Sequence, residues 1–335
     1  MDSRIQEMPK VVLHLHLDGS LRPETVNEWL GEENLKETKE KLMVDRDCRD
    51  LNQYLEKFDL PVQVLQTKDH IERATYELFE DLANQNVIYA EVRFAPSKHL
   101  EGGLSYDEVV EAAISGMNKA KEKFGIDGNL ILCCMRGDDN EKENLETVKT
   151  AKKYLGKGVC ALDLAGAEAL FKTANFEKIF KLAKKNNIPF TIHAGEADGP
   201  ESIKKALEFG AQRIGHGVRC IEDKDLMAKL AQEAIPLEVC PISNLQTQAV
   251  NGKHPIEKLY RKGLCVTVNT DNNTVSNTDM NTEYNWVIEN TDLKINDLIN
   301  MNINAARGIF GDIKTKVKLI EKIMKYKDKN KEKMK

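Results

Sequence analysis

Short runs of apolar and β-branched residues recur along the whole chain, each bounded by polar or turn-forming residues. Eight of them predict β-strands, at residues 11–17, 87–95, 129–136, 159–165, 189–194, 213–217, 235–240 and 264–269. Most are separated by charged amphipathic stretches of helical length, such as SYDEVVEAAISGMNKAKEKFG and NFEKIFKLAKKNN. Strands that alternate with helices in this way predict an α/β fold with a parallel sheet covered by helices.

The number of strands favours a closed (β/α)8 TIM barrel over an open, doubly wound sheet. No GxGxxG follows the first strand, which weakens the dinucleotide-binding alternative. The connection over residues 21–86 is too long for one crossover helix, so we expect extra helices after strand 1 that form a lid. No Gly/Ser- or Pro-rich linker interrupts residues 1–335, which predicts a single domain. The lysine-rich end, roughly 312–335, predicts a helical tail that is frayed and solvated.

Composition excludes several classes of function. The net charge of −5 offers no basic field for nucleic acid or anionic lipid. No run approaches the ~20 apolar residues of a membrane span, and the polar N-terminus lacks the apolar core of a signal peptide. The seven cysteines are odd in number, scattered and free of CxxC pairs. They predict reduced thiols in a cytoplasmic protein, without a cysteine-ligated metal.

Reactive side chains gather where the predicted strands end, which is where barrel enzymes carry their chemistry. The HxH pair of the first strand has i, i+2 spacing, so both imidazoles point to one face. Other strand ends hold the motifs HAGE, RIGHGV and NTD. Together these positions supply His14, His16, His193, Glu196, His216 and Asp271.

Three imidazoles and one carboxylate suit a divalent transition metal, and zinc is the leading choice for a hydrolytic site. Zinc lowers the pKa of bound water from about 15.7 towards ~7, which makes a hydroxide nucleophile at neutral pH. Glu196 lies three residues after His193, close enough to transfer a proton to the substrate. The residues therefore indicate a metal-assisted hydrolase of a small molecule. A zinc amidase or phosphoesterase, and a catalytically silent nucleoside-binding protein on the same barrel, are the alternatives from other classes.

Several longer motifs resemble one family, the adenosine deaminases of the amidohydrolase-type barrels, and its bacterial branch most of all. The matching stretches are LHLHLDGS, KFDLPVQVLQT, YAEVRFAP, ALDLAGAE, TIHAGE, RIGHGV, VCPISN and VTVNTDN. They follow the order of the family and extend from residue 11 to about 277.

The resemblance implies one zinc ion per chain, held by His14, His16, His193 and Asp271. Zinc-bound hydroxide would attack purine C6 while Glu196 protonates N1. His216 would orient the hydroxide and take up or stabilise its proton. The expected reaction is deamination of adenosine and 2′-deoxyadenosine to inosine and 2′-deoxyinosine in purine salvage, with release of ammonia.

The resemblance also implies contacts to a small-molecule purine nucleoside. Gly166 would offer its backbone N–H to purine N3, Asp18 would hold a ribose hydroxyl, and Leu55 and Phe58 would belong to an apolar lid. The expected substrate-binding set is His16, Asp18, Gly166, Asn272, Leu55 and Phe58. Another 6-aminopurine, such as adenine or an adenine nucleotide, remains the alternative substrate.

Asn272 departs from the pattern, because animal members of the family carry a second Asp here, placed against purine N7. An Asn amide donates a hydrogen bond in its neutral form, so we expect Asn272 to read N7 with less dependence on its own protonation.

Three further expectations concern neighbouring positions and assembly. Glu91 and Arg93 alternate on one strand face and are expected to form a buried ion pair. Ser243 and Asn244 lie near the predicted site without an assigned role. The protein is expected to be a monomer or a weak homo-oligomer.

Overall fold

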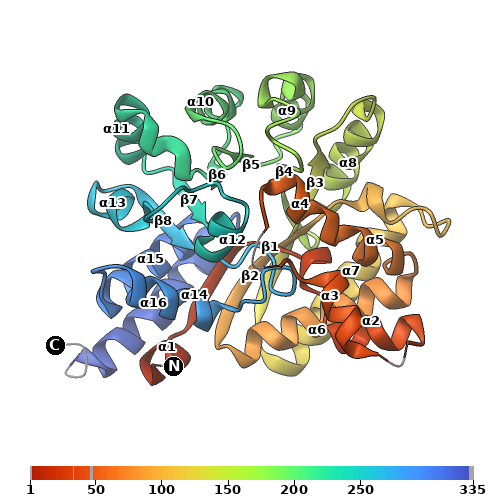
Figure 1. The fold of residues 1–335 in the computed structure, drawn as a ribbon, viewed down its shortest axis with the longest axis horizontal. Helices are drawn as coiled ribbons and strands as arrows, with labels where there is room; N and C mark the ends of the chain where they lie inside the picture. Colours follow the sequence, from red (N-terminus) through yellow and green to blue (C-terminus); the bar gives the residue numbers. More distant parts are fainter. Residues whose placement is uncertain (1, 33, 46–47, 332–335) are drawn as a thin grey trace.

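Eight parallel strands follow one another around the centre of the molecule in the part of the chain that the structure describes (Figure 1). This computed structural model describes residues 2–32, 34–45 and 48–331. The strands are β1 (Lys10–His16), β2 (Val87–Phe94), β3 (Asp127–Met135), β4 (Val159–Ala165), β5 (Thr191–Ala194), β6 (Arg213–His216), β7 (Pro236–Val239) and β8 (Cys265–Val268). All eight predicted strands are confirmed, with ends that differ by no more than two residues.

The strands form two four-stranded parallel sheets, β1-β2-β3-β4 and β5-β6-β7-β8, that meet at two seams. At one seam Leu162 pairs with Phe190, and the Leu162 N–H donates to the Pro189 carbonyl at 3.0 Å. At the other seam Leu15 pairs with Asp271, and the His16 N–H donates to the Asp271 carbonyl at 2.7 Å. The predicted barrel architecture is confirmed, and its second seam places the end of β8 beside the histidines of β1.

An outer layer of helices surrounds the strands (Figure 1). It contains α6 (Lys68–Asn84), α7 (Tyr106–Phe124), α8 (Glu141–Tyr154), α9 (Glu177–Lys185), α10 (Pro200–Phe209), α11 (Lys224–Gln232), α13 (Ile256–Arg261) and α15 (Ile295–Gly308). The longest of these, α7, shows why the sequence forms helices here. Ser105 and Glu108 make a capping box at its start, and Gly125 ends it in the left-handed conformation.

The long connection between β1 and α6 contains the extra helices that the sequence predicts. They are α2 (Pro23–Leu30), α3 (Leu35–Leu42), α4 (Leu51–Leu55), the 3-10 turn η2 (Glu56–Phe58) and α5 (Asp59–Val64). The Val44 N–H donates to the Val275 carbonyl at 3.0 Å, and Leu51 and Tyr54 pack against the Val275 side chain. The insertion is therefore attached to the loop that follows β8, over the carboxyl ends of the strands.

Buried ion pairs fill the interior of the barrel. Arg93 contacts Asp163 and Glu238, both at 2.8 Å, whereas Arg213 contacts Glu91 at 2.5 Å and Glu238 at 2.6 Å. The predicted pair between Glu91 and Arg93 is therefore wrong, although both side chains are buried as expected. Residues i and i+2 of a strand stand side by side and point the same way, so each reaches across the barrel to another strand.

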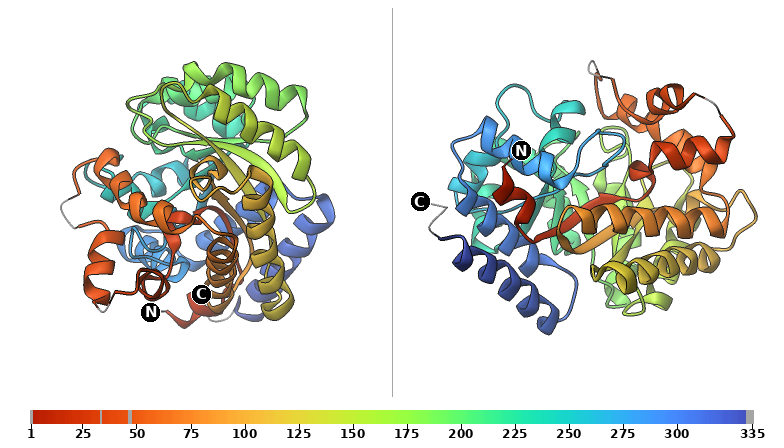
Figure 2. Two further views of the ribbon diagram at one scale, coloured as in Figure 1. Left: turned by 90° about the vertical axis from the view of Figure 1, so that its right-hand side faces the viewer. Right: turned by 90° about the horizontal axis from the view of Figure 1, so that it is seen from below.

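The C-terminal segment forms α16 (Ile313–Lys329), which packs against α15 instead of being frayed and solvated. Leu319, Ile323 and Tyr326 are buried, and the Tyr326 hydroxyl donates to the Arg4 carbonyl at 2.5 Å. This bond links α16 to α1 (Ser3–Glu7), and Figure 2 shows both helices in the same part of the molecule. Leu319, Ile323 and Tyr326 form an apolar stripe at i, i+4 and i+7 spacing on a helix that is otherwise rich in lysine. The number of lysines therefore led to the wrong prediction of a solvated tail. The last part of the predicted tail, 332–335, lies outside the described residues.

Lys10, the first residue of β1, is fully buried without a carboxylate partner among the described residues. Its ammonium group donates to the carbonyls of Met8 and Gln85, both at 2.9 Å. Burial lowers the pKa of Lys10 to about 7. The folded protein therefore holds this side chain against a desolvation penalty whenever it is charged.

Stability should consequently rise with pH relative to a Lys10→Met variant. The unfolded lysine titrates near 10.4, so between pH 7 and pH 9 the unfolded chain binds more protons than the folded one. Between pH 7 and pH 9, the free energy of unfolding of the wild type should therefore increase by about 2 kcal/mol relative to that of the variant. Denaturant titrations of both proteins at both pH values measure the difference; a constant difference contradicts the prediction.

Candidate active site

Five buried side chains converge where β1, β5, β6 and β8 end. The candidate ligand atoms of His14, His193, His216 and Asp271 all lie within 4.8 Å of one another. His16 joins them, because its Nε2 lies 3.2 Å from His193 Nε2 and 3.5 Å from Asp271 Oδ1. The Nε2 of His14 lies 3.2 Å from the same Asp271 oxygen. The predicted ligands are thus brought together, with His216 beside them.

The spacing of these atoms fits a tetrahedral metal ion. Ligands about 2.0–2.1 Å from zinc stand roughly 3.3 Å from one another, close to the separations within this cluster. The Nε2 of His14 is buried and has no hydrogen-bond partner. Nitrogen atoms that face one another in a dry interior are unfavourable unless a cation or a proton lies between them. The donor set is therefore suited to a divalent metal.

Carboxylates on two other strands, β7 and β4, contact two of the imidazoles on the side away from the cluster. His14 Nδ1 lies 2.9 Å from Glu238 Oε2, and His193 Nδ1 lies 2.8 Å from Asp163 Oδ2. Such partners fix the ring orientation and the tautomer of a ligating histidine and leave Nε2 free for the metal. Sequence reasoning assigned neither acid to the site. An acidic residue inside each apolar run, LEV and ALDLA, was the available signal.

The short helix α12 (Pro241–Gln246) supplies two more supporting contacts. The Ser243 hydroxyl donates to Asp271 Oδ2 at 2.6 Å, which leaves Oδ1 facing the histidines. The Asn244 amide nitrogen lies 2.9 Å from His216 Nδ1. This contact to Nδ1 fixes the orientation of the His216 ring and turns Nε2 towards Glu196. The two positions without a predicted role therefore orient two members of the cluster.

Burial controls protonation in the cluster. It lowers the pKa of His16, His193 and His216, which keeps these rings in the neutral form that binds metals. Burial opposes ionisation of Asp271, but the electrostatic effect of the surrounding histidines, His14 foremost, outweighs it and holds the Asp271 pKa well below its ordinary value. His16, His193 and His216 are thus neutral beside the ionised carboxylate of Asp271.

Two members of the cluster adopt backbone conformations that non-glycine residues rarely take. The φ angle is +58° at His216 and +62° at Asp271. His216 is the last residue of β6, and Asp271 lies three residues after the end of β8. Such conformations persist where the surrounding structure enforces them, and they concentrate at functional sites.

Glu196 lies beside the cluster and differs from Asp271 in protonation. Its Oε2 lies 3.4 Å from His216 Nε2, and its Oε1 accepts from the Thr247 hydroxyl at 3.0 Å. Burial, together with the nearby Asp271 charge, raises the pKa of Glu196 well above its ordinary value. A protonated carboxyl group next to a metal site can serve as a general acid.

The loop that carries Glu196 is held by another acid, Glu168. The backbone N–H groups of residues 195–198 all donate to the Glu168 carboxylate at 2.7–3.0 Å, and the Ser202 hydroxyl donates to it at 2.6 Å. Glu168 is the last residue of the ALDLAGAE motif, yet it was not predicted to act in the site. Its contacts fix the position of the Glu196 backbone.

A cavity of about 900 Å³ opens above the cluster. Every predicted site residue except His14 lines it: His16, Asp18, Leu55, Phe58, Gly166, His193, Glu196, His216, Asp271 and Asn272. Asp18 Oδ1 is buried without a partner, and burial raises the Asp18 pKa to about 6. Leu51 and Tyr54 also line the cavity, although sequence reasoning did not include them.

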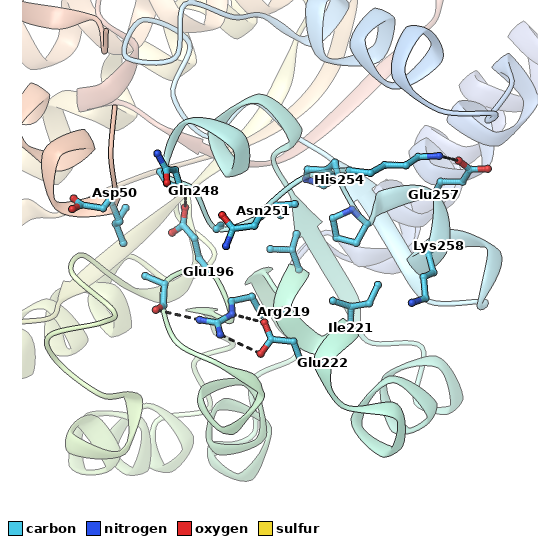
Figure 3. Close-up of a pocket in the computed structure, with 18 of the residues that line it drawn as sticks. Asp50, Glu196, Arg219, Ile221, Glu222, Gln248, Asn251, His254, Glu257 and Lys258 are labelled. Carbon is cyan, nitrogen blue, oxygen red and sulfur yellow. Dashed lines mark hydrogen bonds and ion pairs between the residues drawn. The ribbon is translucent and has the colours of Figure 1, made fainter. Parts of the chain in front are cut away.

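A second cavity, of about 1190 Å³, lies on the other side of Glu196 (Figure 3). Leu51 and Glu196 line both cavities, but no histidine of the cluster lines this one. Its charged side chains include the Arg219–Glu222 ion pair at 2.7 Å, drawn in Figure 3. The reactive groups therefore belong to the smaller cavity.

Comparison of the sequence with known protein families shows the family of this chain. A family model described as adenosine deaminase matches residues 9–326. The chain belongs to the adenosine deaminase family. An adenosine deaminase of Haemophilus ducreyi is 44% identical over 89% of this chain and 90% of its own length. One of Clostridium kluyveri is 43% identical over 95% of this chain and 94% of its own length.

Solved structures of related deaminases share the fold. An adenine deaminase from Arthrobacter aurescens has a TM-score of 0.87 and 27% identity, over 96% of this chain and 99% of its own. An Arabidopsis N6-mAMP deaminase has a TM-score of 0.85 and 28% identity, over 97% of this chain and 100% of its own.

Two further observations concern the chain as a whole. All seven cysteines are free, and only Cys265 is not fully buried. Within residues 2–32, 34–45 and 48–331, every helix is too short or too polar to cross a membrane.

Removing the hydroxyl that holds Asp271 should weaken metal binding. In Ser243→Ala, Asp271 loses the one side-chain hydrogen bond that it receives from outside the histidine cluster among the described residues. Affinity for zinc should therefore fall about tenfold, since supporting contacts of this kind typically contribute 10–100-fold. Competition with a chromophoric chelator measures the affinity. Ser276→Ala is the matched control, because Ser276 contacts Tyr54 and no cluster residue. Equal affinities of Ser243→Ala and wild type contradict the assignment.

Proposed function

We propose that this protein catalyses the hydrolytic deamination of adenosine and 2′-deoxyadenosine to the inosine nucleosides and ammonia, as a purine salvage enzyme. The observation that carries the proposal is the convergence of four histidines and Asp271 beside Glu196, whose raised pKa allows it to hold a proton. Curated relatives of 43–44% identity that bear the name adenosine deaminase support the choice of substrate.

One zinc ion per chain, held by His14, His16, His193 and Asp271, is the proposed cofactor. When bound, zinc supplies Lewis-acid activation of water, whose pKa falls to about 7. The support for this ligand set is the spacing of the candidate ligand atoms: 3.2 Å from His16 to His193, 3.5 Å from His16 to Asp271, and 3.2 Å from His14 to Asp271.

Glu196 and His216 are the proposed proton-transfer residues. The raised pKa of Glu196 supplies a proton at neutral pH, which we assign to purine N1, so that C6 becomes electrophilic. His216 Nε2 faces Glu196 at 3.4 Å, and His216 would orient the attacking water and take up or stabilise its proton.

Substrate contacts are proposed for residues that line the same cavity. The Gly166 backbone N–H would donate to purine N3, and the unpartnered Asp18 oxygen would accept from a ribose hydroxyl. Leu55 and Phe58, from α4 and η2, would exclude water from the base, which strengthens the polar contacts within.

A second candidate is the same chemistry on adenine or an adenine nucleotide. The observation that favours it is the likeness to the adenine deaminase and N6-mAMP deaminase structures. Those proteins are 27–28% identical to this chain, whereas the relatives named adenosine deaminase reach 43–44%. The nucleoside therefore remains the proposed substrate.

The organisation of the protein is also proposed. Residues 1–335 would form one domain, active as a monomer or weak homo-oligomer in the cytoplasm. Seven free cysteines support a reducing compartment, because buried thiols without partners persist there.

The substrate assignment is tested with zinc-loaded protein and four compounds. Adenosine and 2′-deoxyadenosine should lose their ultraviolet absorbance rapidly, with kcat/KM at least 100-fold above the values for adenine and AMP. Metal content is measured on the same sample. Absence of nucleoside turnover by metal-replete protein overturns the proposal, and faster turnover of adenine or AMP establishes the second candidate.

Glu196→Gln tests the proton donor. The amide keeps the size of the side chain and the Thr247 contact but is a far weaker acid, so kcat should fall by several orders of magnitude, while the zinc content stays that of the wild type. Single-turnover rates and metal analysis of both proteins give the comparison. A variant with near-normal rates shows that another group protonates the base.

A further inference from the structure

Tyr54, in the α4 helix over the cavity, carries a hydroxyl that joins the lid to the end of β8. Its Oη lies 2.6 Å from Ser276 Oγ and accepts from Asn272 Nδ2 at 3.0 Å. All three side chains are buried. Burial, with the nearby Asp271 charge, raises the Tyr54 pKa well above its ordinary value, so the phenol keeps its proton and can donate to Ser276.

The Asn272 amide is fixed on both sides. One N–H of Nδ2 donates to Tyr54, and Oδ1 lies directly on the backbone of Gly19. A Cβ at residue 19 would come within 1.7 Å of that oxygen, so only glycine leaves room for this orientation. The second N–H of Nδ2 has no partner among the described residues. It is the donor that Asn272 retains for a ligand in the cavity that it lines.

We propose that Tyr54 is a positioning residue for base recognition: its hydroxyl holds the Asn272 amide so that the free N–H faces N7 of the purine. The inference rests on the proposed function and deepens it. Tyr54 itself needs no contact with N7. It acts by deciding which atom of Asn272 faces the base, since the two ends of an amide are nearly equal in size and opposite in polarity.

The surroundings of Tyr54 make this link rigid. Ser276 and Asn272 belong to one turn, in which the Ser276 N–H donates to the Asn272 carbonyl at 3.1 Å. Tyr54 therefore contacts both ends of the turn at once. Cys48, Leu51 and Val275 pack around it as one buried apolar cluster. Placement of the lid and orientation of the amide are consequently coupled through a single hydroxyl.

Two isosteric ligands separate this role from a merely structural one. 1-Deazaadenosine keeps N7 and lacks N1, whereas 7-deazaadenosine replaces N7 with a C–H group that accepts no hydrogen bond. Both are measured as competitors of adenosine turnover. In Tyr54→Phe, the dissociation constant of 1-deazaadenosine should rise about tenfold, as expected for loss of one oriented hydrogen bond, and that of 7-deazaadenosine should change less than twofold.

Tyr260→Phe is the matched control. Its hydroxyl also accepts from an Asn side chain, Asn300 Nδ2 at 3.2 Å, but it lies outside the cavity. Neither dissociation constant should change in this variant. Asn272→Ala supplies a second test if Tyr54→Phe does not fold: it should likewise weaken only 1-deazaadenosine, and unchanged binding removes Asn272 from base recognition.

Two results overturn the inference: equal weakening of both ligands in Tyr54→Phe, or no weakening of either. Either result counts against the inference alone when the wild-type protein, assayed in parallel, deaminates adenosine. A wild type without that activity refutes the proposed function instead.

Discussion

The rest of this structure depends on a network of buried charged side chains that extends through the barrel from Arg213 to the histidine cluster. Glu238 contacts Arg213 and Arg93 and also His14, and Asp163 contacts both Arg93 and His193. Charges removed from water are costly unless each is paired and hydrogen-bonded. Here Glu238 and Asp163 pair with the arginines and also orient His14 and His193. The geometry of the site therefore depends on the ion pairs inside the barrel.

This arrangement explains why two carboxyl groups in one cavity take opposite roles. Asp271 has imidazoles and the Ser243 hydroxyl around it, which favour its ionised form. Glu196 has Thr247 and a nearby negative charge, so burial dominates and its proton is retained. The environment thus keeps Asp271 ionised, as the proposed metal ligand must be, and Glu196 protonated, as the proposed proton donor must be.

The insertion after β1 contributes to the site mainly through apolar side chains and one hydrogen bond, not through buried charges. Its apolar residues cover the cavity, while one polar atom, the Tyr54 hydroxyl, reaches the turn after β8. An apolar cover excludes water without specifying a ligand, whereas an oriented hydrogen bond distinguishes between ligands of equal shape. The proposed recognition of the base and the cover over the cavity therefore involve the same short helix, α4.

Much of this protein was determined by local sequence. The alternation of apolar runs with amphipathic stretches predicted every strand, because periodicity is set by the geometry of the individual element. Motifs at the strand ends predicted the histidines, Asp271 and Glu196, because barrel topology brings all carboxyl ends to one face.

Only the tertiary structure decided how side chains pair across the barrel. Glu91 and Arg93 are neighbours in sequence, yet each selects a partner on another strand, and α16 covers its apolar stripe against α15 despite its many lysines. Tertiary structure also decided the supporting contacts of the site, which join residues 28 to 224 positions apart in the chain. They involve Asp163, Glu238, Ser243 and Asn244, and the pair of Tyr54 with Asn272. Such partners depend on register and on burial, which no local pattern records, because a charged group in a dry interior takes whichever partner the fold places within reach.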